Sequence, residues 1–352
     1  MDLNRRAFAG STLALGVSAC ATTPAAPVAT VWRALPTEPY RGKQDDIAFV
    51  SPDIGWYGNG AGKLFATRDG GESWTKVWEQ PGTFIRALGF LDERVGFMGN
   101  VGTGYFPNVT DTHPLYSTED GGVTWARVEA SGIENVPGIC GIDIVRDRGA
   151  TIIHAGGRVG GPALLMRSID AGATWRVIDL SAHAGMILDV KFFDADNGFI
   201  CAATNSDIAQ GRALILRTSD GGETWTRAYE GARPFENCWK VCFPSRRVGY
   251  ASVQNYQDGF TQRFVVRTTD GGASWRELPL VDDPRVREFG IGFIDENWGW
   301  VGASTTGFET RDGGGTWRPI EMGPAVNKIR ILRNGRRTRA FAIGSEVRRL
   351  DI

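Results

Sequence analysis

The strongest constraint on the fold is an octet of residues that the sequence repeats six times. Each copy reads Ser/Thr-x-Asp-x-Gly-x-Ser/Thr-Trp, and the first copy occupies residues 67–74. The aspartates of successive copies lie 51, 50, 50, 50 and 42 residues apart, at Asp69, Asp120, Asp170, Asp220, Asp270 and Asp312. A repeat period near 50 residues indicates one supersecondary unit that packs on copies of itself.

The composition of the octet is that of a turn. An aspartate at the start of a turn can accept hydrogen bonds from backbone N–H groups one or two residues ahead, and glycines permit positive φ angles. The octet resembles the Asp-box, or BNR repeat, of sialidases and of several non-enzymatic propellers. We interpret all six aspartates as structural, including the one in the third copy, where Ala171 precedes Gly172.

A second pattern precedes the octets: an apolar alternation, a turn, and then glycine with an aromatic residue. In the first repeat these are residues 47–49 followed by Gly55 and Trp56. The copy in the third repeat, residues 142–145 followed by 151–153, is weaker. Period-2 apolar spacing indicates strands, so each repeat predicts four of them, the last beginning at the octet tryptophan. A seventh repeat at residues 328–350 lacks the octet and the fourth strand, whereas residues 30–35 resemble the sequence that follows an octet.

We therefore predict an all-β fold, a seven-bladed β-propeller over residues 30–352. Its ring is closed by an N-terminal strand that joins the C-terminal blade, which leaves only short and protected sheet edges.

Residues 1–29 are interpreted as a targeting region. Arg5 and Arg6 followed by an apolar run resemble a twin-arginine export signal, and the sequence that ends at Cys20 resembles a lipobox. Residues 1–20 are thus predicted to be a lipoprotein signal, and residues 21–29 a flexible tether. We expect export, with lipid anchorage through Cys20 on the periplasmic side of a membrane.

Charge and motifs exclude several function classes. A formal net charge of −1 lacks the basic footprint of a nucleic-acid-binding protein. The sequence contains no haem-attachment motif, no dinucleotide-binding motif and no set of residues at the spacing of metal ligands. We therefore predict no cofactor and no metal. The other four cysteines are interpreted as buried thiols: Cys140, Cys201, Cys238 and Cys242. We expect a monomer.

Binding is predicted on the face opposite the octets, which carries the long loops and the connections between blades. Aromatic residues mixed with arginine are typical of interface hot spots. The last blade adds a cluster of arginines that could dock an acidic partner or form a solvated surface. The candidate binding residues are Arg86, Tyr105, Phe106, Arg233, Trp239, Lys240, Tyr256, Arg287, Arg336 and Arg337.

Carboxylates near the channel allow an enzymatic alternative. Asp45 and Asp189 could act as the acid and base of a glycosidase, or each could belong to an ion pair that lines the channel. We favour ion pairing, and the arginine triad and tyrosine–glutamate pair of a sialidase are not apparent. No catalytic residue is assigned.

The whole predicted propeller resembles a known family. Its octets, together with residues 293–300 in the pattern Phe-x-Asp-x-x-x-Gly-Trp, look like those of the photosystem II assembly/stability factors. The resemblance implies a non-enzymatic propeller that binds a newly made reaction-centre membrane protein. We therefore expect a scaffold that binds a membrane or envelope protein through its loop-rich face. The alternative is a glycoside hydrolase or glycan-binding propeller.

Overall fold

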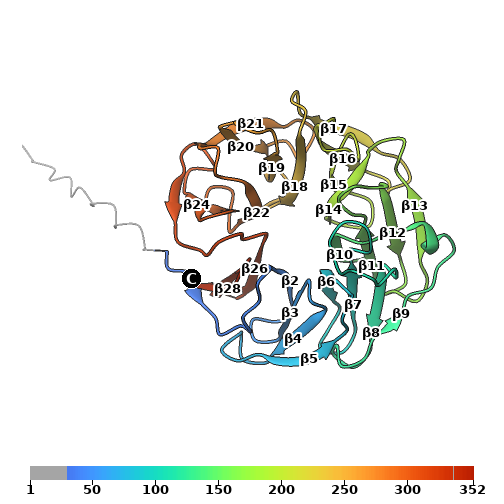
Figure 1. Ribbon diagram of the computed structural model, residues 1–352. Coiled ribbons are helices and arrows are strands. Elements are labelled where there is room, and N and C mark those ends of the chain that lie inside the picture. Colours follow the sequence, from blue (N-terminus) through green and yellow to red (C-terminus); the bar gives the residue numbers. More distant parts are fainter. Residues whose placement is uncertain (1–29, 336) are drawn as a thin grey trace, which may run out of the picture. The chain divides into compact units, whose positions relative to one another are not determined.

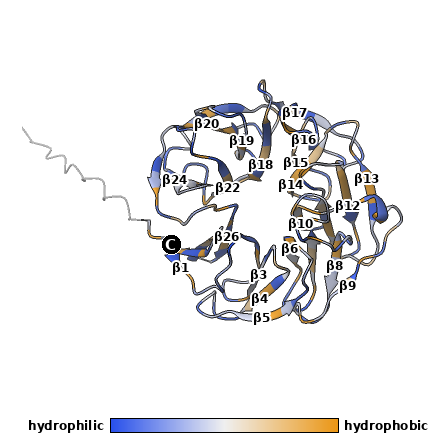
Figure 2. Cartoon of the chain, viewed as in Figure 1, coloured by the Kyte–Doolittle hydropathy of each residue, from blue (hydrophilic) through white to orange (hydrophobic). Residues whose placement is uncertain are grey.

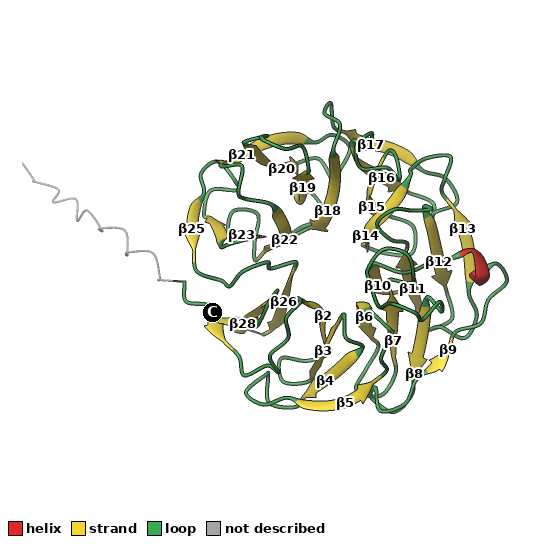
Figure 3. Ribbon diagram, in the orientation of Figure 1, coloured by secondary structure: helices red, strands yellow, loops and turns green. Residues whose placement is uncertain are grey.

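The computed structural model describes residues 30–335 and 337–352, and within them the regular secondary structure is almost entirely strand, joined by loops and turns (Figures 1 and 3). The predicted signal, the tether and the lipidation site Cys20 lie outside the described residues, as does Arg336. In the described part the strands form seven antiparallel sheets of four strands each. We call the sheets blades 1 to 7, in chain order of their innermost strands.

The first four blades follow one another along the chain. Blade 1 contains β2 (Gln44–Phe49), β3 (Gly55–Asn59), β4 (Lys63–Thr67) and β5 (Thr75–Glu79). Blade 2 contains β6 (Ile85–Phe90), β7 (Gly96–Asn100), β8 (Leu115–Thr118) and β9 (Ala126–Arg127). Blade 3 contains β10 (Gly141–Asp147), β11 (Ala150–Gly156), β12 (Leu164–Ser168) and β13 (Arg176–Asp179). Blade 4 contains β14 (Met186–Phe192), β15 (Gly198–Ala203), β16 (Ala213–Thr218) and β17 (Thr226–Glu230).

The last three blades end with the one that combines both ends of the propeller. Blade 5 contains β18 (Glu236–Cys242), β19 (Gly249–Asn255), β20 (Gln262–Thr268) and β21 (Arg276–Asp282). Blade 6 contains β22 (Glu288–Phe293), β23 (Gly299–Ala303), β24 (Gly307–Thr310) and β25 (Arg318–Ile320). Blade 7 contains β26 (Lys328–Asn334), β27 (Arg337–Ile343), β28 (Val347–Asp351) and β1 (Arg33–Ala34). A short 3-10 helix, Ile133–Asn135, lies between blades 2 and 3; no helix in the described residues has the length and apolarity to cross a bilayer.

The prediction of seven blades is confirmed, and the N-terminal strand pairs with the last blade as expected. Arg33 and Ala34 of β1 pair antiparallel with Arg349 and Arg348 of β28. The strand is shorter than the predicted residues 30–35. The inner strands of successive blades contact one another around the ring, and β2 of blade 1 also contacts β26 of blade 7 (Figure 1).

The hydrophobic core lies between neighbouring blades rather than within one sheet. Buried side chains of one such cluster come from both blade 4 (Phe199) and blade 5 (Val241, Phe264). Hydrophobic residues recur along the strands that supply these clusters (Figure 2).

The repeated glycine–aromatic pair has a packing reason. Gly55 lies opposite Phe49, whose ring would be 2.4 Å from a Cβ atom at that position. The residue after the glycine then reaches the next blade: Trp56 of blade 1 stacks on Phe90 of blade 2, with ring centroids 3.6 Å apart. In the weaker third repeat His154 fills the aromatic position and stacks on Phe192 at 3.5 Å.

Each octet forms the turn between the third and fourth strands. In the first copy the Thr67 hydroxyl donates to Asp69 Oδ1 (2.7 Å), and Asp69 accepts from the Ser73 backbone N–H (2.9 Å) and hydroxyl (2.6 Å). The same hydrogen bonds recur in the other five copies. The carboxylate thus accepts hydrogen bonds from a residue four positions ahead, whereas the sequence predicted donors one or two positions ahead. The fourth strand begins one residue after the tryptophan, not at the tryptophan as predicted.

The octets and the turns between first and second strands share one face of the ring, which we call the octet face. The Gly70 N–H of the first octet, for example, donates to the Asp53 carbonyl of the β2–β3 turn (2.8 Å). The opposite face, which we call the loop face, carries the remaining connections. Inner strands therefore run from the loop face to the octet face, and their first residues surround the loop-face mouth of the channel.

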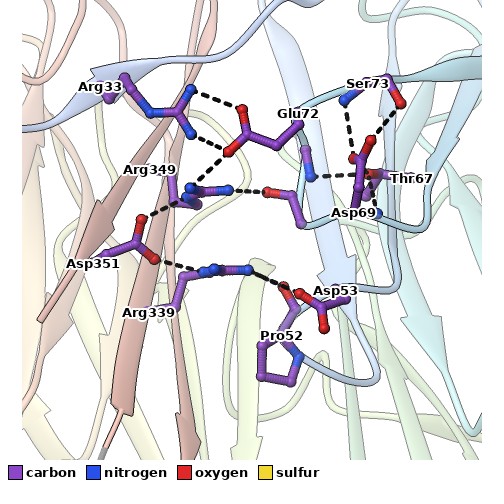
Figure 4. A network of polar contacts seen from close by, with 12 residues as sticks. Arg33, Pro52, Asp53, Thr67, Asp69, Glu72, Ser73, Arg339, Arg349 and Asp351 are labelled. Carbon is purple, nitrogen blue, oxygen red and sulfur yellow. Dashed lines mark hydrogen bonds and ion pairs between the residues drawn. The ribbon is translucent and has the colours of Figure 1, made fainter.

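Polar contacts also join blade 7 to blade 1 (Figure 4). Glu72 of the first octet accepts from Arg33 of β1 (2.5 Å) and from Arg349 of β28 (2.9 Å). Arg349 also donates to the Gly70 carbonyl (2.8 Å), and Arg339 donates to the Pro52 carbonyl (2.6 Å). The ring closure therefore uses both strand pairing and side-chain contacts between the two ends of the propeller.

Candidate functional site

Six of the predicted binding residues come together at the loop-face mouth of the channel. They are supplied by loops and inner strands of different blades and lie close enough to interact electrostatically or through ring contacts: Arg86, Tyr105, Trp239, Lys240, Tyr256 and Arg287. Two further residues that the sequence did not single out as binding residues, Lys43 and Phe289, complete this group, which we call the mouth cluster.

Aromatic rings and cations alternate within the mouth cluster. Trp239 and Phe289 pack edge to face, with centroids 6.3 Å apart. Arg86 Cζ lies 5.1 Å and Lys240 Nζ 5.6 Å from the Trp239 ring, and Lys43 Nζ lies 4.6 Å from the Phe289 ring. Such contacts between cations and aromatic faces are attractive, and they hold both kinds of group in fixed positions.

The outer part of the cluster is accessible. Arg287 is exposed and its Cζ lies 4.5 Å from the ring of Tyr256, which is partly buried. Tyr105 is 46% exposed and packs edge to face on Phe106, which stacks on Phe84 with centroids 4.5 Å apart. Phe106, another predicted binding residue, therefore extends the aromatic surface beside the mouth.

Two of the cations already have carboxylate partners. Arg86 forms a buried ion pair with Asp45, and Lys240 Nζ lies 3.3 Å from Asp189. Lys43 has no carboxylate within 4 Å in the described part of the chain. Burial lowers the pKa of Lys43 to about 8; repulsion from Arg86, Lys240 and Arg287 adds to this effect, which Asp45 opposes.

The channel below the mouth is lined by inner strands of all seven blades and encloses about 350 Å³. Its carboxylates repeat one arrangement, in which an aspartate accepts a backbone N–H from the next blade and pairs with a lysine. Asp46 accepts from Leu88 N (2.7 Å) and pairs with Lys328 (2.5 Å). Although burial opposes it, pairing with Lys328 and with Arg330 keeps the pKa of Asp46 below its usual value.

The same arrangement holds for Asp143, which pairs with Lys191 (2.8 Å) and accepts from Phe192 N (2.7 Å). Asp189 likewise accepts from Val241 N (3.2 Å). The two aspartates considered as a glycosidase pair, Asp45 and Asp189, are thus both in ion pairs.

Arg233 lies away from the mouth, at the outer edge of the loop face. Its guanidinium donates to Glu236 (2.6 Å) and Glu277 (2.6 Å) and covers the Phe264 ring at 4.2 Å. Arg233, Glu277 and Phe264 border an outer groove of about 500 Å³ on blade 5. Arg233 is therefore held in a network of its own.

The arginines of blade 7 also do not reach the mouth. Arg337 begins β27 and is exposed at the octet face, on the opposite side of the ring. Arg330, Arg333, Arg348 and Arg349 contact carbonyl groups or carboxylates of blades 7, 6 and 1. The arginine cluster noted in the sequence is thus largely occupied by contacts within the ring.

Each octet aspartate is exposed, but its oxygens are occupied by hydrogen bonds. Donors from the octet serine or threonine lower the pKa of five of them to about 2: Asp69, Asp120, Asp170, Asp220 and Asp270. The pKa of the sixth, Asp312, is also lowered. These contacts assign the octets to turn structure. The described residues contain no cluster of three or more His, Cys, Asp or Glu side chains suited to a metal ion. Their four cysteines are free thiols; Cys140, Cys201 and Cys238 are buried as predicted, whereas Cys242 is only partly buried.

No protein-family model and no curated protein matches this sequence. Solved structures do match it. The structure of YCF48 bound to a D1 peptide has a TM-score of 0.61 and 17% identity, covering 92% of this chain and 94% of that one. YCF48 from Cyanidioschyzon merolae has a TM-score of 0.64 and 16% identity, covering 91% and 98%.

A glycoside hydrolase is also similar in fold. The GH74 xyloglucanase from Xanthomonas campestris has a TM-score of 0.55 and 13% identity, and the match covers 86% of this chain and 51% of that one. At these identities the shared property is the fold, and fold alone does not assign function. The resemblance stated from the sequence is confirmed at that level: the chain is a seven-bladed β-propeller similar to YCF48.

Proposed function

We propose that this protein is a non-catalytic scaffold that binds a segment of a membrane or envelope protein at the mouth cluster. The observation that carries the proposal is the convergence of four cations and four aromatic rings from separate blades on one accessible site. Arginine and aromatic anchors on a rigid support are the usual centre of a binding interface. The similar YCF48 structure contains a D1 peptide, which is consistent with a polypeptide ligand.

The test is capture of a partner from solubilised membranes by purified protein that carries a photo-crosslinker at position 106. Arg287→Glu and Tyr105→Ala should each reduce crosslinked partner at least tenfold, because both side chains are exposed parts of the cluster. Arg285→Glu is the matched control from the same connection, since Arg285 is exposed and pairs with Asp283 instead. Equal capture by Arg287→Glu, Tyr105→Ala and wild type would refute the proposal.

We also propose export and anchorage through Cys20, which would hold the propeller at the membrane where its partner resides. The support is the order of the twin-arginine pair, the apolar run and the lipobox-like sequence. Cys20→Ser should move the protein from the membrane fraction to the soluble periplasmic fraction. Unchanged membrane association of that variant would contradict the anchor.

The alternative of a glycoside hydrolase or glycan-binding propeller has weaker support. A GH74 xyloglucanase is similar in fold, but the carboxylates considered for catalysis are occupied by Arg86 and Lys240. We expect no release of reducing sugar from a polysaccharide panel. Hydrolysis that Asp45→Asn or Asp189→Asn abolishes would favour the enzyme.

A further inference from the structure

The lysines of the chain are distributed unevenly. The sequence has only six, and four of them lie at or near the channel: Lys43, Lys191, Lys240 and Lys328. Three of these four form ion pairs with aspartates of the inner strands. Lys43 is the exception, because its ammonium faces the Phe289 ring and no carboxylate of the described residues lies within 4 Å. Lys43 therefore does not neutralise an aspartate of the channel.

The mouth cluster carries an excess of positive charge. Its four cations face two carboxylates: Asp45 forms an ion pair with Arg86, and Asp189 forms one with Lys240. Lys43 and Arg287 remain without such a partner among the described residues. Lys43 is partly buried, and an uncompensated cation that is partly removed from water is costly unless an anion joins it.

A buried amide beside these cations has hydrogen-bonding capacity that is not fully used. Asn237 is 1% exposed, and neither atom of its side-chain amide makes a well-formed hydrogen bond in the described part of the chain. The amide lies against the Tyr256 hydroxyl and opposes the rise that burial causes in the pKa of Tyr256, while that hydroxyl donates to Gln254. Since the Arg287 guanidinium lies over the Tyr256 ring, the amide and the guanidinium flank the same side chain.

We propose that the mouth cluster binds a carboxylate, held by Lys43 and Arg287 with a further hydrogen bond from the Asn237 amide. A carboxylate accepts hydrogen bonds from several donors at once and is bound in bidentate fashion by arginine. It would compensate one of the two excess positive charges and give the buried amide a further acceptor. The inference deepens the proposed function, because the carboxylate would belong to the bound segment.

The experiment uses acetate as the probe and the whole chain in solution. Acetate is titrated at constant ionic strength, against chloride, while the Asn237 side-chain amide and the Trp239 indole are followed by 1H–15N NMR. Wild type should show saturable shifts at both groups. Lys43→Met and Arg287→Gln should weaken the affinity at least tenfold, whereas the matched controls Lys76→Met and Arg285→Gln should leave it unchanged.

Three results would overturn the assignment: shifts that do not saturate, unchanged affinity in Lys43→Met and Arg287→Gln, or tighter binding of inorganic phosphate than of acetate. Indole signals of the octet tryptophans report whether each variant is folded. Acetate binding without capture of a membrane protein would refute only the proposed function. Capture without acetate binding would refute only the carboxylate site.

Discussion

Ala171 stands where the other five octets have glycine, and the backbone does not change to accommodate it. Its φ angle is +62°, close to the +71° of Gly70 at the same position in the first octet. A side chain in this left-handed region costs about 1–2 kcal/mol, because Cβ approaches the following carbonyl oxygen. The octet geometry is therefore imposed by its hydrogen bonds and by the strands that it joins.

Ala171→Gly should raise the free energy of unfolding by about 0.5–1 kcal/mol, since relief of the strained φ exceeds the extra chain entropy of glycine. Urea unfolding at pH 7 measures the change. Ala173→Gly, in the same turn but without a positive φ, should be slightly destabilising. Destabilisation by both substitutions would show that the entropy of glycine in the unfolded chain outweighs the φ strain at Ala171.

Glu288 is a buried acid that forms no ion pair within 4 Å in the described part of the chain. Its side chain is fully buried, and neither carboxyl oxygen makes a well-formed hydrogen bond there. Burial raises its pKa from 4.5 to about 8, although nearby backbone N–H groups of Glu288 and Phe264 and the charge of Arg263 oppose the shift. Arg263 donates its own hydrogen bonds to the Asn255 and Pro284 carbonyls.

Glu288 should therefore make stability fall as pH rises. Between pH 4.5 and about 8 the folded state keeps a proton that the unfolded state has lost, so lower pH favours folding by up to about 1.4 kcal/mol per pH unit. Glu288→Gln should remove this slope from urea unfolding measured at pH 5, 6, 7 and 8. The exposed Glu129→Gln should retain it, and an unchanged slope in Glu288→Gln would assign the pH dependence to other groups.

Among the elements, the octet turns do more than connect the third and fourth strands. The first octet is also a docking point for blade 7, through Gly70 and Glu72 (Figure 4). Arg167 of blade 3 similarly lies against Gly221 of the next blade's octet. Arginines of several strands thus join neighbouring blades, and those near the C-terminus are largely occupied by such contacts.

For the whole molecule, closure of the ring depends on a short N-terminal element. Strand β1 has two residues, but Trp32 beside it is 3% exposed and packs edge to face on Trp300 of blade 6 at 5.3 Å. Trp32 directly precedes β1, as an octet tryptophan precedes its fourth strand. The fourth strand of blade 7 and the tryptophan before it are therefore supplied by the N-terminal end of the propeller. Blade 7 is therefore anchored from both of its neighbours.

Trp32→Ala should destabilise the propeller by about 3–5 kcal/mol, the usual cost of emptying a buried aromatic site. Val31→Ala is the control at the adjacent position, where the side chain is 69% exposed, and should change stability by less than about 0.5 kcal/mol. Both are measured by urea unfolding of the full chain. Similar small effects of the two substitutions would mean that the N-terminal strand does not hold the ring closed.

The sequence by itself determined the number of blades and the pairing of the two ends. Both follow from local signals, because octet spacing, period-2 apolar runs and the unpaired strand remnant at residues 30–35 can each be recognised without knowing any contact. The roles of the octet aspartates are equally local, since their hydrogen bonds close within four residues.

Only the tertiary structure decided which side chains share a site. Strand direction placed Arg337 on the octet face, and packing of blade 5 placed Arg233 at the outer edge of the loop face, away from Arg287. Lys43 and Phe289 come from blade connections and inner strands almost 250 residues apart, and packing around the ring brings the lysine to within 4.6 Å of the aromatic ring. Contacts between blades depend on the relative placement of whole sheets, which no local pattern encodes.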